Sequence, residues 1–163
     1  MIKSIFLNHK AKARTAQKAH CTYEEASSIG ILYNAEEFDT SIISELSDVF
    51  KSDQKTVGKL GYIDKPEDPE AVENFIFTKK DISGTGTIKK DSISFFMNQS
   101  FDFLVSLDTS QNINYKYILA TSKANCKVGL ETDSYGDLLL MAIKPEEQKS
   151  ASAKSLIKYL KMI

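Results

Sequence analysis

Cysteine and histidine are both scarce in this chain of 163 residues, which has two of each. Cys21 and Cys126 lie far apart in sequence, and two cysteines are too few for a disulfide framework or a zinc site of their own. We therefore interpret both as ordinary reduced thiols. His9 and His20 fall within the first twenty residues, so the rest of the chain offers no histidine base for nucleophilic catalysis.

Long hydrophobic runs are absent as well. No stretch of about 18 apolar residues occurs, so the sequence predicts no membrane-spanning helix. A polar segment follows Leu7, which leaves no apolar segment of signal-peptide length, and we expect a cytoplasmic protein. No HExxH motif, nucleophile elbow, Walker motif or EF-hand loop occurs either. The sequence therefore predicts no metal, no cofactor and no catalytic residue.

Positive charge is concentrated at the start of the chain. Five of the 21 basic residues precede the first acidic residue, Glu24, which leaves 16 basic residues against all 22 acidic ones in the remainder. Several alanines and the absence of glycine and proline favour a helix here. We expect residues 1–22 to form a basic helical arm attached to an acidic α/β body, residues 23–163. The basic residues of the arm are Lys3, Lys10, Lys12, Arg14 and Lys18.

Two interpretations of this arm remain open. In the first, it binds a protein partner or an anionic surface, because clustered positive charges are attracted to phosphates. In the second, it is a solvated amphipathic helix that packs on the acidic body. No aromatic residue lies between Lys10 and Lys18 to stack on bases, which argues against nucleic acid as the partner.

Apolar runs alternate with amphipathic segments along the remainder of the chain. Residues 101–130 show the pattern most clearly, because a continuous apolar run, a polar break and a segment with helical spacing follow one another as in a βαβ unit. The sequence therefore predicts a single α/β domain with a doubly wound, mostly parallel sheet and helices on both faces. Further strands are expected at 28–33, 55–63, 75–77, 93–97 and 138–143, and further helices beginning at Asp39 or Thr40 and at Pro145.

Polar residues follow two of the predicted strands. Ligands of such sheets bind beyond the carboxyl ends of the strands, where Asn34 and Glu36 follow the first strand and Asp108, Thr109 and Ser110 follow the central one. Asp108 is the strongest candidate, because a carboxylate just past a buried strand can bind a hydroxyl, a metal or a cationic group. The same position equally suits an aspartate that caps a helix or closes a turn.

Gly84-Thr-Gly86, which precedes Lys89 and Lys90, also has two interpretations. One is a phosphate-binding loop, and the other is a turn. The third glycine of a dinucleotide-binding fingerprint and a Gly-Lys-Ser/Thr sequence are both missing, which favours the turn.

The segment Phe101 to Gly129 resembles part of the N-terminal domain of heptosyltransferase-type, two-domain glycosyltransferases. The shared pattern is Phe-Asp, an apolar strand ending in a polar residue and leucine, and a helix that closes with Ser-Lys-Ala-Asn-Cys-Lys-Val-Gly. This chain has Ser106 where that family places an aspartate, so the resemblance implies a Rossmann-like fold and a degenerate transferase site. Taken end to end, the chain is similar to a family of small uncharacterised bacterial proteins of unknown function.

Two functional hypotheses follow. The first is a non-catalytic cytoplasmic α/β module that binds a partner or an anionic surface through its basic helical arm. The alternative is a nucleotide-binding or sugar-binding protein, or a degenerate glycosyltransferase-like domain, with its ligand over Asn34, Asp108, Thr109 and Ser110.

Overall fold

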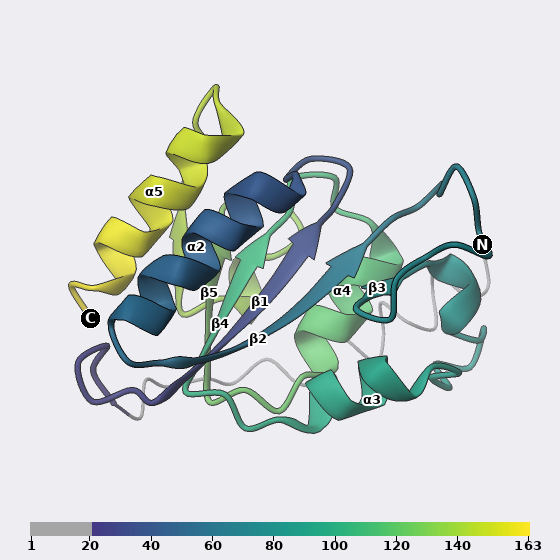
Figure 1. Ribbon diagram of the computed structural model, residues 1–163, viewed down its shortest axis with the longest axis horizontal. Coiled ribbons are helices and arrows are strands. Elements are labelled where there is room, and N and C mark those ends of the chain that lie inside the picture. The colour runs from purple at the N-terminus through teal and green to yellow at the C-terminus, as the bar shows by residue number, and fades with distance from the viewer. Residues whose placement is uncertain (1–20) are drawn as a thin grey trace.

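A parallel β-sheet forms the centre of the chain (Figure 1). The structure, a computed structural model, describes residues 21–163. The sheet has six strands, which are β1 (Ser28–Asn34), β2 (Thr56–Tyr62), β3 (Ile76–Phe77), β4 (Phe103–Leu107), β5 (Cys126–Leu130) and β6 (Met141–Ile143). Their order is β3-β2-β1-β4-β5-β6, and all neighbours are parallel. The chain therefore winds outward in both directions from β1 and β4, which confirms the predicted doubly wound fold.

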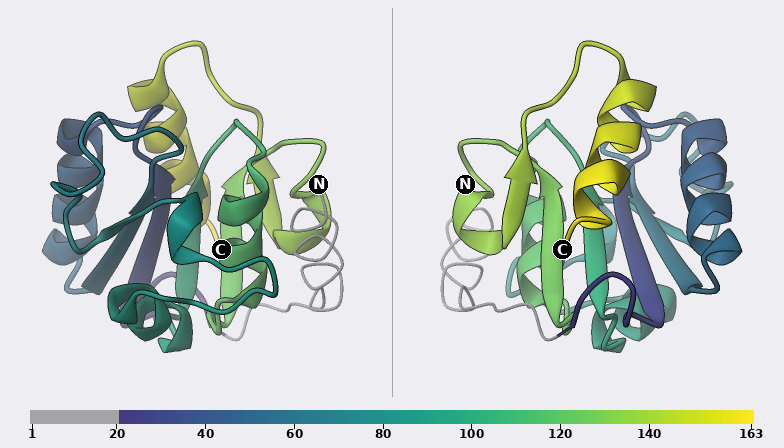
Figure 2. Two further views of the ribbon diagram at one scale, coloured as in Figure 1. Left: turned by 90° about the vertical axis from the view of Figure 1, so that its right-hand side faces the viewer. Right: turned by 90° about the vertical axis from the view of Figure 1, so that its left-hand side faces the viewer.

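Helices cover both faces of this sheet. Buried side chains of α2 (Thr40–Ser52) and α5 (Lys149–Leu160) pack on one face, and those of α3 (Asp91–Asn98) and α4 (Ile113–Thr121) pack on the other. Figure 2 shows the strands side by side and α5 running back along the sheet. Both faces are thus covered, as the predicted fold class requires.

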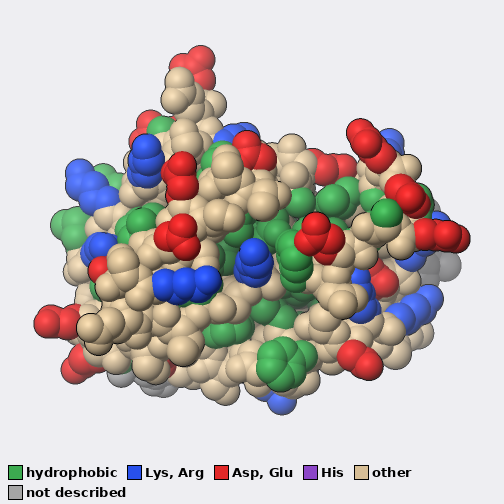
Figure 3. Space-filling view, viewed as in Figure 1, with side chains coloured by type: hydrophobic (Ala, Val, Ile, Leu, Met, Phe, Trp, Pro, Cys, Tyr) green, Lys and Arg blue, Asp and Glu red, His purple; other side chains and the backbone are tan. Residues whose placement is uncertain are grey.

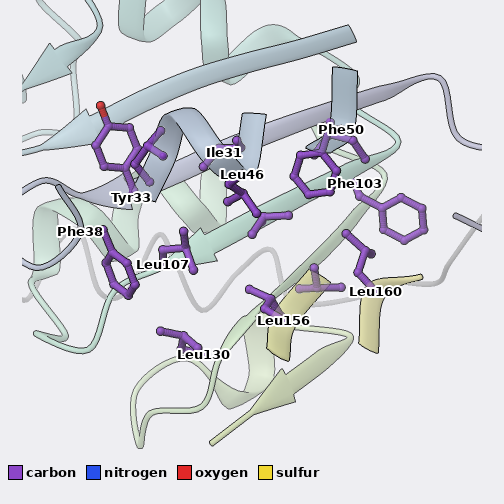
Figure 4. Close-up of a cluster of buried hydrophobic side chains, with 14 of the residues drawn as sticks. Ile31, Tyr33, Phe38, Leu46, Phe50, Phe103, Leu107, Leu130, Leu156 and Leu160 are labelled. Carbon is purple, nitrogen blue, oxygen red and sulfur yellow. The ribbon is translucent and has the colours of Figure 1, made fainter. Parts of the chain in front are cut away.

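Successive side chains of β1 pack alternately into the two hydrophobic cores, one on each face of the sheet. Ile31 and Tyr33 pack on the face covered by α2 and α5, whereas Leu32 packs on the opposite face. Figure 4 shows Leu46 of α2 and Leu156 of α5 meeting the first of these faces. Because both faces are buried, polar residues occur only at the two ends of the strand, Ser28 and Asn34, and the sequence between them shows no polar alternation.

The start of α2 agrees with the sequence. Asp39 is the N-cap residue, and its carboxylate accepts a hydrogen bond from the Ile42 amide at 3.0 Å. Ile43, Leu46 and Phe50 are buried, as helical spacing predicts.

Three predicted elements are wrong in type or extent. Residues 93–97, expected as a strand, lie in α3, where Ile93 and Phe96 occupy one buried helical face. The last strand spans only Met141–Ile143 and is partly exposed, because β6 is an edge strand with a single neighbour. The last helix begins at Lys149 instead of Pro145.

The segment around Gly84 and Gly86 forms a turn. The Ser83 amide donates a hydrogen bond to the Thr87 carbonyl at 2.9 Å, and Gly86 has a positive φ of 85°. The turn interpretation of these glycines is therefore confirmed.

The basic arm falls almost wholly outside the described residues, and so do Lys3, Lys10, Lys12, Arg14 and Lys18. Its junction with the body is described. The Tyr23 hydroxyl donates to Asp53 at 2.7 Å, and the Lys55 ammonium donates to the Tyr23 carbonyl at 2.7 Å. Asp53 and Lys55 lie between α2 and the start of β2, so the arm joins the body at the amino-terminal edge of the sheet. From residue 21 onward, no helix is both long and apolar enough to cross a membrane.

Candidate functional site

Asp108 lies immediately after β4, at the point where the winding of the sheet reverses, and it is fully buried. Its Oδ1 atom accepts hydrogen bonds from Asn34 Nδ2 and Ser110 Oγ, both at 2.7 Å. Its Oδ2 atom accepts one from the Gln111 amide at 3.1 Å and another from the Tyr135 hydroxyl. Each carboxylate oxygen thus has two donors, which is its full capacity.

Asn34 is equally occupied. Its side-chain amide reaches Ser110 Oγ at 3.2 Å in addition to Asp108, and its Oδ1 atom accepts the Glu36 amide at 3.0 Å. The structure therefore brings Asn34, Asp108 and Ser110 together, as the positions of these residues at strand ends led us to expect. We call these three residues, together with Tyr135, the Asp108 cluster.

The side chains of Thr109 and Glu36 form their hydrogen bonds outside this cluster. The Thr109 amide and hydroxyl both donate to the Glu37 carboxylate at 2.8 Å, and Lys149 Nζ lies 4.0 Å from the same carboxylate. Glu36 is exposed, and its Oε1 atom accepts the Lys65 amide at 3.3 Å. Glu37, which was not among the predicted site residues, thus ties the loop after β1 to the loop after β4.

Two buried tyrosines complete this region. Tyr135 comes from the loop after β5 and was not among the predicted site residues, because no local pattern pointed to its contact with Asp108. Tyr115 donates to the Leu32 carbonyl at 2.7 Å and lies 2.9 Å from Ser106 Oγ. Burial, followed by the charge of Asp108, raises the pKa of both tyrosines well above its ordinary value, so both hydroxyls stay protonated.

The chemistry open to this arrangement is limited by its own hydrogen bonds. Every polar side-chain atom of Asn34 and Asp108 already has a partner. None of the five predicted ligand residues lines the cavity of about 590 Å³ between β2 and α3 or the cavity of about 510 Å³ beside α2. Within residues 21–163, no three carboxylates, histidines or thiols converge to form a metal site. These contacts join three loops, and the cluster therefore acts as a structural clamp.

Comparison with known proteins places the chain in a family. A family model described as a family of unknown function, DUF6913, matches residues 1–163. No curated protein and no solved structure matches the chain. The match spans the whole length, so the chain belongs to the DUF6913 family.

Proposed function

We propose that this protein is a non-catalytic cytoplasmic module that binds a negatively charged partner through its basic arm. The observation that carries the non-catalytic part is the saturated Asp108 carboxylate, which has four donors from its own chain. A substrate at this point of the sheet would have to replace hydrogen bonds that are already made. Because such exchange leaves buried groups unpaired, it is unfavourable.

Charge separation supports the binding part of the proposal. Five basic residues and no acidic residue precede Glu24, while the remainder has 16 basic and 22 acidic residues. Each basic residue near an anionic membrane contributes about 1 kcal/mol of attraction. The arm also joins the body at the amino-terminal edge, opposite the Asp108 cluster, so a partner can be held without disturbing that cluster.

Charge-neutralised variants test this function. One variant replaces Lys3, Lys10, Lys12, Arg14 and Lys18 with glutamine, and a matched control replaces the exposed body residues Lys51, Lys65, Lys80, Lys89 and Lys123. Both lose the same charge. Binding to phosphatidylserine vesicles, measured by co-sedimentation, should weaken at least about a hundredfold in the first variant and only slightly in the control. It should also weaken with added salt.

Equal vesicle binding by both variants, or binding that does not change with salt concentration, would contradict the proposal that the arm is the binding element. Salt-sensitive capture of an acidic protein without vesicle binding would instead identify a protein as the partner. The nucleotide or sugar alternative is tested by thermal shift with nucleotide sugars. A shift that is lost in Ser110→Ala would favour that alternative, because Ser110 is the exposed hydroxyl of the cluster.

A further inference from the structure

A cavity of about 510 Å³ lies beside the Asp108 cluster, also at the carboxyl edge of the sheet. The end of β1, the start of α2 and the loop between β2 and β3 form its walls. Figure 3 shows hydrophobic side chains in a hollow between α2 and this loop, with acidic side chains at its margin. The volume is within the range of small-molecule sites. We call it the Tyr33 cavity, and its main lining residues are Tyr33, Phe38, Ile63, Val72, Phe75 and Ile76.

Tyr33 distinguishes this cavity from other hollows of the surface. The residue is only 4% exposed, and no hydrogen bond joins its hydroxyl to a described residue, but the hydroxyl is not among the fully buried polar atoms and so is open to the cavity. Figure 4 shows the hydroxyl directed away from the other labelled side chains. A hydroxyl that is open at the wall of a largely apolar cavity can form a hydrogen bond with a polar group of a ligand, and a few such polar groups are typical of small-molecule sites.

The neighbouring strand makes room for this tyrosine. Gly61 lies opposite Tyr33 in the sheet, and a Cβ atom on Gly61 would lie 2.7 Å from Tyr33 Cζ and 2.5 Å from Ile76 Cδ1. Any larger residue would therefore displace the ring. The absence of a side chain at position 61 keeps the ring against the sheet and its hydroxyl at the cavity.

The charge around the cavity is negative. Asp39, Glu67, Asp68 and Glu73 all line it and are exposed. Two lysines lie over its aromatic walls, with Lys59 Nζ 4.8 Å from the Phe75 ring centre and Lys149 Nζ 5.5 Å from that of Phe38, but no lysine or arginine among the described residues lines the cavity itself.

The start of α2 adds to this preference. The N-terminus of a helix attracts anions when its amide groups are free. Here the carboxylate of Asp39 accepts a hydrogen bond from the Ile42 amide and so already occupies that position. An anionic ligand is repelled here and an organic cation is attracted.

We propose that the Tyr33 cavity binds a small organic amine with an apolar body. The apolar body packs against Phe38, Phe75 and Ile76, and the ammonium group lies among the four carboxylates. The Tyr33 hydroxyl accepts a hydrogen bond from the ammonium group. The contact is purely non-covalent, and the proposal does not depend on the basic arm or on its partner.

The protonation state of Tyr33 agrees with this role. Burial, followed by the nearby charge of Glu73, raises the pKa of Tyr33 to about 12. The hydroxyl is therefore neutral at physiological pH, and its oxygen can accept a hydrogen bond from the ammonium group.

Three probes of similar shape test the proposal on the full-length protein. 2-Phenylethylamine carries the cation, 2-phenylethanol is neutral, and 3-phenylpropionate is an anion. In a titration followed by methyl and aromatic NMR, the amine should shift the signals of Ile76 and Tyr33. The alcohol and the acid should bind with dissociation constants at least about tenfold larger.

Matched variants localise the effect. Tyr33→Phe should weaken amine binding about fivefold to tenfold, and Glu73→Gln should weaken it about threefold, because each removes one polar contact. Glu70→Gln, on the same loop but outside the cavity, should leave it unchanged. The variant with a neutralised arm should also bind the amine normally, which separates this proposal from the proposed function.

Three results would overturn the proposal. The first is equal binding of the three probes, which would mean that charge plays no part. The second is an amine-induced shift confined to residues outside the cavity. The third is the absence of any amine-dependent shift up to about 10 mM, which corresponds to a free energy too small for a built site.

Discussion

The Asp108 cluster and the Tyr33 cavity lie at the same edge of one sheet, but they use their polar atoms in opposite ways. Asp108 is fully buried and has four donors from its own chain, whereas the Tyr33 hydroxyl has no partner among the described residues and is open to the Tyr33 cavity. A polar side chain at a strand end is therefore not a binding residue by position alone. Whether its hydrogen-bonding capacity is still open decides its role.

The largest expected effect comes from breaking the cluster. Asp108→Ala removes the acceptor of Asn34, Gln111 and Tyr135, and should lower the free energy of unfolding by about 3–5 kcal/mol. Urea unfolding measures this loss. Asp39→Ala is the control, because it removes an exposed capping carboxylate and should lower stability by only about 1 kcal/mol. Equal losses in the two variants would mean that the cluster is not a structural clamp.

A smaller effect is expected from filling the space beside Tyr33. Gly61→Ala places a Cβ atom against the Tyr33 ring and Ile76, and such overpacking should lower the free energy of unfolding by about 1–3 kcal/mol. Displacement of the ring should also weaken amine binding. Gly136→Ala is a suitable control, since no atom lies within 4 Å of a Cβ built there. Unchanged stability in Gly61→Ala would show that the ring can shift freely.

The smallest effect concerns a carboxylate at the opposite edge. Burial acts to raise the pKa of Asp102, but hydrogen bonds from Ser27 and Ser28 outweigh it and lower the pKa below its usual value. The ionised Asp102 carboxylate therefore stabilises the folded protein. This stabilisation is complete above the ordinary pKa of about 4 and is lost as the pH falls through the lower pKa of the folded state. The stability difference between the natural protein and Asp102→Asn should therefore shrink between about pH 6 and about pH 3. A difference independent of pH would contradict the lowered pKa.

Much of the fold was predictable because most strands are buried on both faces and stand out as apolar runs. The first strand, predicted at 28–33 and found at Ser28–Asn34, and the start of α2, predicted at Asp39 or Thr40, are examples, since each depends on local sequence. Residues 93–97 were misassigned because a short apolar run rich in aromatic residues does not reveal its period. The extent of β6 was also missed, because edge position is a property of the whole sheet.

The candidate site was predictable only in part. Strand ends indicated where Asn34 and Asp108 would lie, because parallel strands bring their carboxyl ends together. The contact of Tyr135 with Asp108 joins residues 27 positions apart through a loop with no regular pattern. The open hydroxyl of Tyr33 was hidden within an apolar strand. Whether the hydrogen-bonding capacity of Asp108 or of the Tyr33 hydroxyl is filled depends on how separate loops pack together. A local sequence pattern does not indicate this.

The most direct measurement compares two identical substitutions, Tyr135→Phe and Tyr33→Phe, by urea unfolding of the full-length protein. Each removes a single hydroxyl from a buried tyrosine. Tyr135→Phe should lower the free energy of unfolding by about 1–2 kcal/mol, because Asp108 loses a donor, while Tyr33→Phe should change it by less than about 0.5 kcal/mol. Equal losses, or a greater loss in Tyr33→Phe, would contradict the distinction between a saturated clamp and an open cavity.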